Sequence, residues 1–345
     1  MGSRWGRSLR AAACVFVAAV AVGLLALTIG QRSAGESLWW IELSRYLPYY
    51  WPLVPCVAAF GLSLWLGRVW VLVSAASLLL LFTATMGLQW NSGATGPEQV
   101  RLMTYNVKVH GSEVRDGAYP ALAVEVAKHD PDILVMQDAD DLVSMRTAPA
   151  LIGGPPVFGL PHVYALGQYV VASRFPLRGC SPADMGFRDE SHRYLRCVFD
   201  VRGIELTVVT AHFKSPRSGL SATRHEGVDG AGEWRQNFDD RLTQARKVAA
   251  GLAGLKRPLV LVGDLNAPES SPVIQTLLKA GLGDAFSAAG KGYGFSYGQS
   301  LKRGLSFLRI DHILVSPELG VANCFAGGGD ASEHRPVIAD LVLRR

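Results

Sequence analysis

The chain changes character near residue 90. Residues 1–90 consist mostly of Ala, Val, Leu, Trp and Phe, whereas the remainder has the mixed composition of a globular protein. The apolar run that ends there is about 40 residues long, which exceeds what the core of a water-soluble protein normally accommodates. We therefore predict a membrane domain at residues 1–90, a linker at 91–98 and one folded domain at 99–345.

Three apolar stretches divide the first part, at residues 9–29, 51–66 and 69–90, and Gly67-Arg68 separates the last two. A helix needs about 20 apolar residues to cross a bilayer, so we expect an N-terminal bundle of three transmembrane helices. The first stretch is also similar to a signal peptide, but no clear Ala-x-Ala cleavage site follows it, and we expect it to be retained. One long buried helix over the last two stretches is the alternative.

Positive charge sets the expected orientation. Arg4, Arg7 and Arg10 precede the first stretch and Arg68 lies in the turn between the last two, and arginines favour the cytoplasmic side. The amino terminus and this turn are therefore predicted to be cytoplasmic. Three crossings of the cell membrane then place the folded domain outside the cytoplasm, whereas a two-span topology would reverse this orientation.

The folded domain is nearly electroneutral. Six of the 34 Lys and Arg but only two of the 29 Asp and Glu precede residue 98, which leaves 28 basic and 27 acidic residues. A protein that binds nucleic-acid backbone usually carries excess positive charge. The charge balance therefore makes nucleic acid a less favoured partner, whereas the apolar first part makes the lipid bilayer an expected one. The sequence indicates no protein partner.

Three cysteines, Cys180, Cys197 and Cys324, lie in the folded domain. A domain outside the cytoplasm permits a disulfide between Cys180 and Cys197. Unpaired buried cysteines are the alternative, and we favour it. No pair has the short spacing that is typical of a zinc site.

Short runs rich in Val, Ile and Leu alternate with helical periodicity in the folded domain, which is the pattern of an α/β fold. The predicted strands are residues 100–107, 132–137, 168–173, 194–201, 204–212, 258–263, 309–316 and 336–343. The predicted helices are residues 119–129, 233–255 and 271–280. Apolar residues recur at helical spacing in the second helix, so we expect it to pack on a sheet.

Polar residues follow the apolar strand 258–263 in the sequence Gly263-Asp264-Leu265-Asn266. If the strand continues briefly, Asp264 and Asn266 project to the same side and act on one target. A surface turn capped by Asp-x-Asn is the alternative.

Asp311 and His334 lie in or next to the last two predicted strands. Held together, they form a pair in which the carboxylate fixes the imidazole tautomer and raises its basicity. Such a pair serves general acid–base catalysis. Taken singly, each residue is also compatible with an ordinary strand-end carboxylate or loop histidine.

Seven short motifs that contain such polar residues follow one another along the chain. They are Thr104-Tyr105-Asn106, Gln137-Asp138, Ser173-Arg174-Phe175-Pro176, Thr210-Ala211-His212, Gly263-Asp264-Leu265-Asn266, Arg309-Ile310-Asp311-His312 and Ser332-Glu333-His334-Arg335-Pro336. Their order resembles that of the endonuclease/exonuclease/phosphatase superfamily, which has the DNase I-like fold. The resemblance implies a four-layer α/β/β/α sandwich and metal-dependent hydrolysis of phosphoester bonds.

The resemblance also implies catalytic roles. His212 would donate to a phosphate oxygen, Asp264 would orient or activate the nucleophile, and Asn266 would be its hydrogen-bonding neighbour. Asp311 would support His334, the final histidine of the motif set.

Metal binding is implied for Asn106, Asp138 and Glu333, with Mg²⁺ expected and Mn²⁺ as the alternative. Asp138 stands where the family usually has glutamate, and Glu333 stands where it usually has aspartate. One carbon–carbon bond changes ligand reach by about 1.5 Å. We therefore expect a shift in metal position or affinity, while every charge is retained.

Three spans followed by such a domain also resemble a membrane-anchored bacterial branch that includes teicoplanin-resistance proteins of the VanJ type. This resemblance implies a lipid-linked phosphate or pyrophosphate, or a phospholipid, as the substrate. Cationic candidates for binding its phosphate are Lys214, Arg193, Arg196 and Arg335, for which surface solvation is the alternative. The segment 214–232 is expected to form a loop that borders the cleft.

Three functions remain open at this point. The favoured one is a membrane-anchored hydrolase with an extracytoplasmic active site. The second is a membrane-tethered nuclease, and the third is a non-catalytic binding module that results from the changes at Asp138 and Glu333.

Overall fold

The computed structural model describes residues 2–33, 35–109, 118–140, 142, 156–298 and 305–343. The chain divides into two compact units, Met1–Gln89 and Trp90–Arg345, each of which is described by itself.

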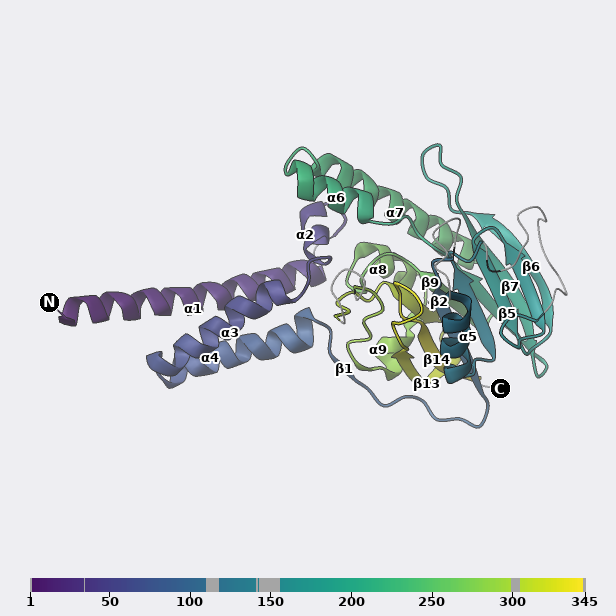
Figure 1. Ribbon diagram of the computed structural model, residues 1–345, viewed down its shortest axis with the longest axis horizontal. Helices are drawn as coiled ribbons and strands as arrows, with labels where there is room; N and C mark the ends of the chain where they lie inside the picture. Colours follow the sequence, from purple (N-terminus) through teal and green to yellow (C-terminus); the bar gives the residue numbers. More distant parts are fainter. Residues whose placement is uncertain are drawn as a thin grey trace. The chain divides into compact units, whose positions relative to one another are not determined.

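The unit Met1–Gln89 is helical. Its elements are α1 (Gly2–Ser33), α2 (Trp39–Ser44), α3 (Tyr50–Leu66), α4 (Arg68–Leu80) and the π-helical turn η1 (Leu81–Thr85). Gly67 ends α3 with a φ of 119°, a conformation that glycine adopts readily, and the chain reverses there into α4. Figure 1 shows α3 and α4 as neighbouring helices that run in opposite directions.

Two helical segments of this unit are long and apolar enough to cross a membrane, Trp5–Ser33 and Arg68–Thr85. The first lies at the amino terminus, where a signal sequence has the same character. The helix α3 is apolar but shorter, with 17 residues. The helical part of the third predicted span ends at Thr85 and not at residue 90. The number of spans and their orientation stay predictions.

The unit Trp90–Arg345 contains two six-stranded sheets. The first has the order β13-β14-β2-β3-β5-β4, and the second has the order β10-β12-β9-β8-β7-β6. The strands of the first are β2 (Gln99–Asn106), β3 (Ile133–Gln137), β4 (His162–Leu166), β5 (Tyr169–Ser173), β13 (Leu319–Ala326) and β14 (Val337–Leu343). Those of the second are β6 (Leu177–Asp184), β7 (Arg193–Val201), β8 (Ile204–Thr210), β9 (Leu259–Asp264), β10 (Gly283–Asp284) and β12 (Asp311–Val315). Two short strands, β1 (Gln89–Trp90) and β11 (Lys291–Gly292), lie outside these sheets.

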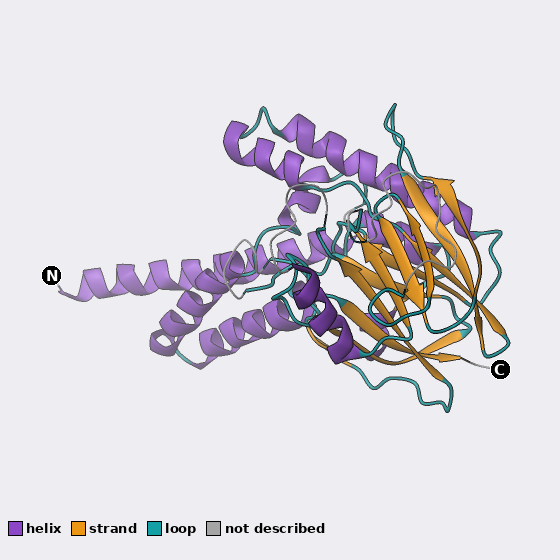
Figure 2. Ribbon diagram, turned by 45° about the vertical axis from the view of Figure 1, so that its right-hand side comes forward, coloured by secondary structure: helices purple, strands orange, loops and turns teal. Residues whose placement is uncertain are grey.

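Helices lie on the outer sides of the paired sheets, as Figure 2 shows. They are α5 (Ala118–His129), α6 (Arg217–Glu226), α7 (Ala231–Leu252) and α8 (Pro272–Lys279). The short helix α9 (Ala285–Ala289) instead packs into the core between the sheets, next to β12 and β13. Alternate residues of β2 enter two different cores, because side chains of a strand alternate between its faces. Val100 and Leu102 pack between the sheets, whereas Met103 and Tyr105 pack with Leu122 of α5. The predicted α/β sandwich with two sheets is thus confirmed.

Strand direction determines where the polar motifs lie. Each sheet has one parallel pair, β2 with β3 in the first and β8 with β9 in the second. The strand β12 runs antiparallel to β9, with Asp311 opposite Asp264, and β14 runs antiparallel to β2, with Val337 opposite Thr104. The antiparallel strands therefore begin at the edge where the parallel strands end, and Asn106, Asp264 and Asp311 lie there.

Every predicted strand and helix of residues 99–345 is present, with ends shifted by a few residues. The predicted loop 214–232 was wrong, because it contains α6 and the start of α7. The sequence of α6 is mostly polar and contains one Gly and two Ser, so its helical state depends on packing. A Cβ atom at Gly219 would lie 2.9 Å from the Cα of Trp234, which shows how closely α6 approaches α7.

The favoured prediction of unpaired cysteines was also wrong for two of the three. Cys180 and Cys197 form a disulfide between β6 and β7, where the strand register places them directly opposite each other. The disulfide was the less favoured alternative, because β6 contains Pro182 and mixed polarity and was not recognised as a strand that pairs with β7. Cys324 is buried and unpaired, as expected.

A buried ion network supports the second sheet. Arg309 donates to Asp284 (3.0 Å) and to Glu269, and Asp284 also caps α9 by accepting from the amide of Ser287 (3.0 Å). Burial opposes ionisation of Asp284, but the charge of Arg309 and a hydrogen bond from His312 lower its pKa. The network joins β10, the approach to β12 and the segment that follows Asp264.

Removal of this carboxylate should destabilise the fold. We expect Asp284→Asn to lower the free energy of unfolding by about 3 kcal/mol, because the buried guanidinium of Arg309 loses the more buried of its two carboxylate partners and keeps only Glu269. A lowered pKa means that the ionised group stabilises the fold above the ordinary aspartate value of about 4, and that this contribution is lost as the pH falls below it. Thermal unfolding followed by circular dichroism from neutral to acidic pH should therefore be more pH-dependent in the wild type. The exposed Asp229→Asn is the control, and an Asp284→Asn protein as stable as that control would contradict the expectation.

Candidate active site

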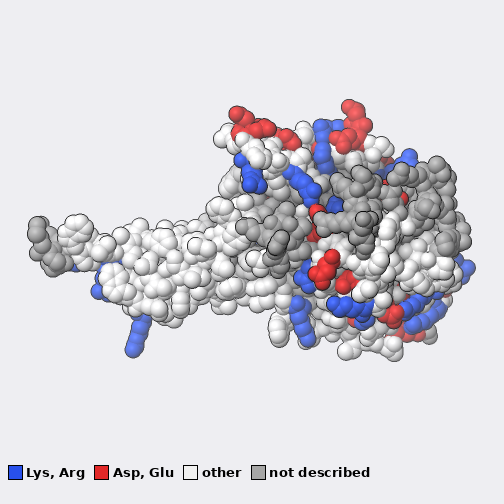
Figure 3. All heavy atoms as spheres, viewed as in Figure 1, with Lys and Arg blue, Asp and Glu red and all other residues white. Residues whose placement is uncertain are grey.

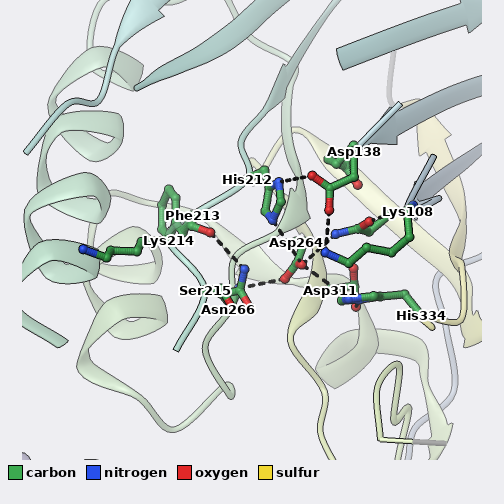
Figure 4. Close-up of polar contacts among 12 residues, drawn as sticks. Lys108, Asp138, His212, Phe213, Lys214, Ser215, Asp264, Asn266, Asp311 and His334 are labelled. Atoms are coloured by element: carbon green, nitrogen blue, oxygen red, sulfur yellow. Dashed lines mark hydrogen bonds and ion pairs between the residues drawn. The ribbon is translucent and has the colours of Figure 1, made fainter. Parts of the chain in front are cut away.

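The site lies where the two sheets meet at one edge. Asn106, at the end of β2, belongs to the first sheet, and Asp264, at the end of β9, belongs to the second. The Asn106 side-chain amide donates to Asp264 Oδ2 at 2.9 Å. The Gln137 side chain likewise donates to Thr210 Oγ1 at 3.1 Å, also from one sheet to the other. The site is thus assembled from both sheets, and Figure 4 shows the side chains that converge there.

Asp264 occupies the centre of the site and is buried. Its Oδ1 atom accepts from the backbone amide of Asn266 at 3.0 Å. Its Oδ2 atom lies 3.5 Å from His212 Nε2 and 3.7 Å from His334 Nε2, in addition to its contact with Asn106. One buried carboxylate is therefore placed between two imidazoles. Its predicted role toward a nucleophile stays a prediction.

The segment around Asp264 has an unusual backbone. Gly263 has a φ of 139°, and a Cβ atom at this position would lie only 2.0 Å from the carbonyl oxygen of Ala211. Asn266 has a φ of 49°, in the left-handed region. Its side-chain amide donates to the Phe213 carbonyl at 2.9 Å, so it holds the segment after His212 rather than facing an open target. Arg241 of α7 donates to the Asn266 carbonyl at 3.0 Å.

The predicted pair of Asp311 and His334 is formed, with 2.9 Å between Asp311 Oδ2 and His334 Nδ1. When Nδ1 donates to the carboxylate, Nε2 faces Asp264, and the tautomer is fixed in the way that acid–base catalysis requires. Burial favours the neutral ring, but the charges of Asp311 and Asp264 raise the pKa of His334. The ring of Tyr297 packs on His334 with centroids 4.7 Å apart and further restrains it.

His212 is held by three partners, two at its ring and one at its backbone amide. Its Nδ1 lies 2.5 Å from Gln168 Oε1 and 3.3 Å from Asp138 Oδ1, while Tyr169 accepts from its backbone amide at 3.0 Å. Burial favours the neutral ring, but the hydrogen bond and charge of Asp138 raise the pKa of His212. A protonated His212 would present Nε2 as a donor toward Asp264 and toward a bound anion.

Two of the predicted metal ligands, Asn106 and Asp138, lie in the site, and both are engaged by protein groups. Asp138 has a φ of 50° and contacts the ammonium group of Lys108 (2.5 Å) as well as His212. Burial opposes its ionisation, but His212 and Lys108 lower the pKa of Asp138. The third predicted ligand, Glu333, lies 3.2 Å from Arg217 and is partly exposed.

Asp264, Asp311 and His334 form a further group that could hold a metal, with ligand atoms within 4.8 Å of one another. Asp311 Oδ1 is buried without a hydrogen-bond partner among the residues that the structure describes. Carboxylate and amide oxygens without thiolates suit a hard divalent cation. The donor set of the site therefore fits such an ion, whereas the ligand roles of Asn106, Asp138 and Glu333 stay predictions.

The predicted phosphate-binding cations are dispersed. Lys214 forms an ion pair with Asp240 at 2.9 Å. Arg335 donates to three backbone carbonyls, which indicates a structural role, and burial lowers its pKa. Arg193 is exposed at the start of β7, and Arg196 of the same strand lies near the Tyr194 ring. Figure 3 shows basic and acidic side chains intermingled on one face of the protein, in keeping with the balanced charge.

Sequence reasoning missed several residues of the site. Lys108 contacts Asp138, and Gln168 contacts His212. Arg217 contacts both Tyr297 (3.1 Å) and Glu333. The position of Lys108, two residues after the motif residue Asn106, was a usable signal. Gln168 and Arg217 lie outside the motifs, and only the fold brings them close.

A pocket of about 430 Å³ adjoins the site. It is lined by the turn between β4 and β5 (166–169), by Pro182 and by residues 191–195. Gln168 both lines this pocket and contacts His212. A molecule bound in the pocket would therefore lie next to the group that supports His212.

The sequence model of the Endonuclease/Exonuclease/phosphatase family matches residues 103–334. This range contains Asn106, Asp138, His212, Asp264 and His334. No curated protein matches the chain.

Two solved structures with a TM-score above 0.5 are similar to this chain in fold, and a third has a lower score. A Bacteroides vulgatus endonuclease/exonuclease/phosphatase protein has a TM-score of 0.52 and 17% identity, and the match covers 72% of this chain and 100% of that chain. A humanized D. rerio TDP2 has a TM-score of 0.52 and 14% identity, with 70% and 98% covered. A Beutenbergia cavernae endonuclease/exonuclease/phosphatase has a TM-score of 0.49 and 21% identity, with 72% of each chain covered. At these identities the likeness concerns the fold alone.

Gly263 should tolerate no side chain. We expect Gly263→Ala to lower the free energy of unfolding by about 3 kcal/mol or more, because the added methyl group overlaps the Ala211 carbonyl and the φ is unfavourable. Thermal unfolding of the purified protein measures the loss. Gly254→Ala is the matched control, because a Cβ atom at Gly254 meets nothing within 4 Å. Equal melting temperatures of the two variants would refute the close approach of β9 to the segment after β8.

Proposed function

Because the chain belongs to the endonuclease/exonuclease/phosphatase family, we propose that it hydrolyses phosphoester bonds with the help of a divalent metal. The form that we favour is a membrane-anchored enzyme with an extracytoplasmic active site. Its proposed substrate is a lipid-linked phosphate or pyrophosphate, or a phospholipid.

The observation that carries the proposal is the position of Asp264. It is buried between His212 and His334, and each histidine is oriented through Nδ1 by a different partner. Both Nε2 atoms therefore face the same carboxylate. An arrangement with one anionic base and two oriented imidazoles suits hydrolysis of a phosphoester by water.

The roles follow from these contacts. Asp264 orients a water molecule and accepts its proton as the water oxygen bonds to phosphorus. Protonated His212 donates to a phosphoryl oxygen and stabilises the negative charge that develops there. Protonated His334, held by Asp311, donates its Nε2 proton to the leaving oxygen as the phosphorus–oxygen bond breaks. The proton that Asp264 accepted from water then returns to His334, whose Nε2 atom lies 3.7 Å from Asp264 Oδ2. Asn106 fixes Asp264 through its amide.

A divalent metal, Mg²⁺ or Mn²⁺, would be held by Asn106, Asp138 and Glu333 and would supply positive charge to the phosphoryl oxygens.

Two features support an anchored enzyme outside the cytoplasm. The apolar segments Trp5–Ser33 and Arg68–Thr85 have the length and composition of membrane spans. The disulfide between Cys180 and Cys197 suits an oxidising compartment, since disulfides rarely persist in the cytoplasm. Anchoring also raises the effective concentration of the enzyme near a lipid substrate.

The pocket beside Gln168 supports a substrate that is larger than phosphate itself. Its walls include Leu166, Tyr169, Pro182 and Leu195, which are apolar for most of their surface, and Arg193 adds a positive charge. Pockets of several hundred Å³ are typical of sites for small organic groups. We propose that it receives the part of the substrate next to the reacting phosphate.

The activity is testable with the full-length protein in detergent. With Mg²⁺ we expect phosphate release from a polyprenyl pyrophosphate, and its loss when a chelator is added. Asp264→Ala and His334→Ala should each lower turnover by about 100-fold or more, because each removes a proton-transfer group. His162→Ala, a histidine of β4 outside the site, should leave turnover unchanged. Phospholipid, sphingomyelin and plasmid DNA are tested in parallel. Cleavage of DNA alone would indicate the nuclease, and no turnover of any substrate would indicate the binding module.

The pocket is tested by filling it. We expect Ser191→Trp to raise KM for the large substrate by about tenfold, since the loss of one well-filled contact region costs roughly 1 to 3 kcal/mol. A small aryl phosphate should be hydrolysed as before, because it does not need the pocket. Ser191→Ala is the control for the loss of the hydroxyl group. An equal effect of Ser191→Trp on both substrates would exclude the pocket from substrate binding.

A further inference from the structure

Lys108 is a cation at the centre of the site. Its backbone amide donates to Asn106 Oδ1 at 3.2 Å, and its φ of 52° turns the chain immediately after β2. Its ammonium group donates to Asp138 Oδ2 at 2.5 Å. Figure 4 shows the side chain directed toward the carboxylates of Asp138 and Asp264. Lys108 therefore occupies the region to which a divalent metal would be attracted.

The setting of this ion pair differs from that of an ordinary surface pair. The side chains of Lys108 and Asp138 are 28% and 15% exposed, whereas those of Lys256 and Glu205 are 76% and 49% exposed. Withdrawal of two charged groups from water costs free energy, so a mostly buried ion pair adds little net stability to the fold. Stability alone therefore does not account for the pair of Lys108 and Asp138. The pair also lies beside His212, which contacts the other oxygen of Asp138.

Competition follows from the chemistry of Asp138. A divalent cation at hydrogen-bond distance from Asp138 would lie close to the ammonium group of Lys108. Like charges at such a separation repel strongly in a partly buried site. Binding of the metal to this carboxylate therefore requires the ammonium group to move away from it.

We propose that Lys108 is a built-in cation of the active site, which competes with the divalent metal for Asp138 and, once displaced, supplies positive charge to a phosphoryl oxygen. The competition concerns metal binding alone. The role toward the phosphoryl oxygen rests on the proposed function. Lys108 has a flexible stem and three donors, so the same group can serve Asp138 in the metal-free protein and a phosphoryl oxygen in the loaded one.

The test is a titration with Mn²⁺ of the full-length protein in detergent, in which free Mn²⁺ is followed by electron paramagnetic resonance. We expect Lys108→Met to bind Mn²⁺ about tenfold more tightly than the wild type, because the competing charge is gone. Lys108→Arg should bind Mn²⁺ as the wild type does, since it retains the charge. Lys256→Met is the matched control, because it removes a lysine that also pairs with a carboxylate.

Turnover supplies the second measurement. At saturating Mn²⁺, phosphate release by Lys108→Met should be about 100-fold slower than in the wild type, and Lys108→Arg should restore part of it. Circular dichroism establishes that each variant is folded, and Lys108→Gln replaces Lys108→Met if the latter does not fold.

The outcomes separate the two proposals. The competition is overturned if folded Lys108→Met or Lys108→Gln binds Mn²⁺ no more tightly than the wild type does. Tight binding with undiminished turnover overturns the role of Lys108 toward the phosphoryl oxygen. Tighter Mn²⁺ binding by Lys108→Met in a protein whose wild type cleaves no phosphoester supports the competition and contradicts only the proposed function.

Discussion

The buried carboxylate of Asp264 is the constraint on which the unit Trp90–Arg345 depends. A charge in the interior is tolerated only where donors surround it. These donors come from different parts of the fold: the amide of Asn106 from the first sheet, and the backbone of Asn266 from the second. His212 and His334 approach the same carboxylate from either sheet. The relative position of the two sheets is thus coupled to the formation of the site.

Much of this arrangement was predictable from the sequence, because it depends on where strands end. The apolar runs before Asn106, His212 and Asp264 predict strands. The polar residues at the ends of these runs predict the position of the site. The pairing of Asp311 with His334 was predictable from the motif order, and it is confirmed. The side chain of Asn266 was expected to act on the same target as Asp264. Its amide instead donates to the Phe213 carbonyl.

The remainder depends on contacts between distant segments, which strand patterns do not encode. The segment of α6 has no helical signal of its own and is shaped by packing against α7. The partner of Cys180 depends on the register of an edge strand that contains Pro182. Lys108 was overlooked for another reason: a lysine in a loop usually points to solvent, whereas here Asp138 draws it into the site.

The strand register at the centre of the second sheet carries a further consequence. Asp311 and Asp264 are directly paired residues of β12 and β9, followed by four more pairs that end with Val315 and Val260. A slip by one residue turns every side chain of a strand to the opposite face. An insertion or deletion within either strand would therefore separate the two carboxylates, whereas a change of length in the connecting segments would not. Divergence of this protein should accordingly be concentrated in its loops, while the lengths of these two strands are maintained.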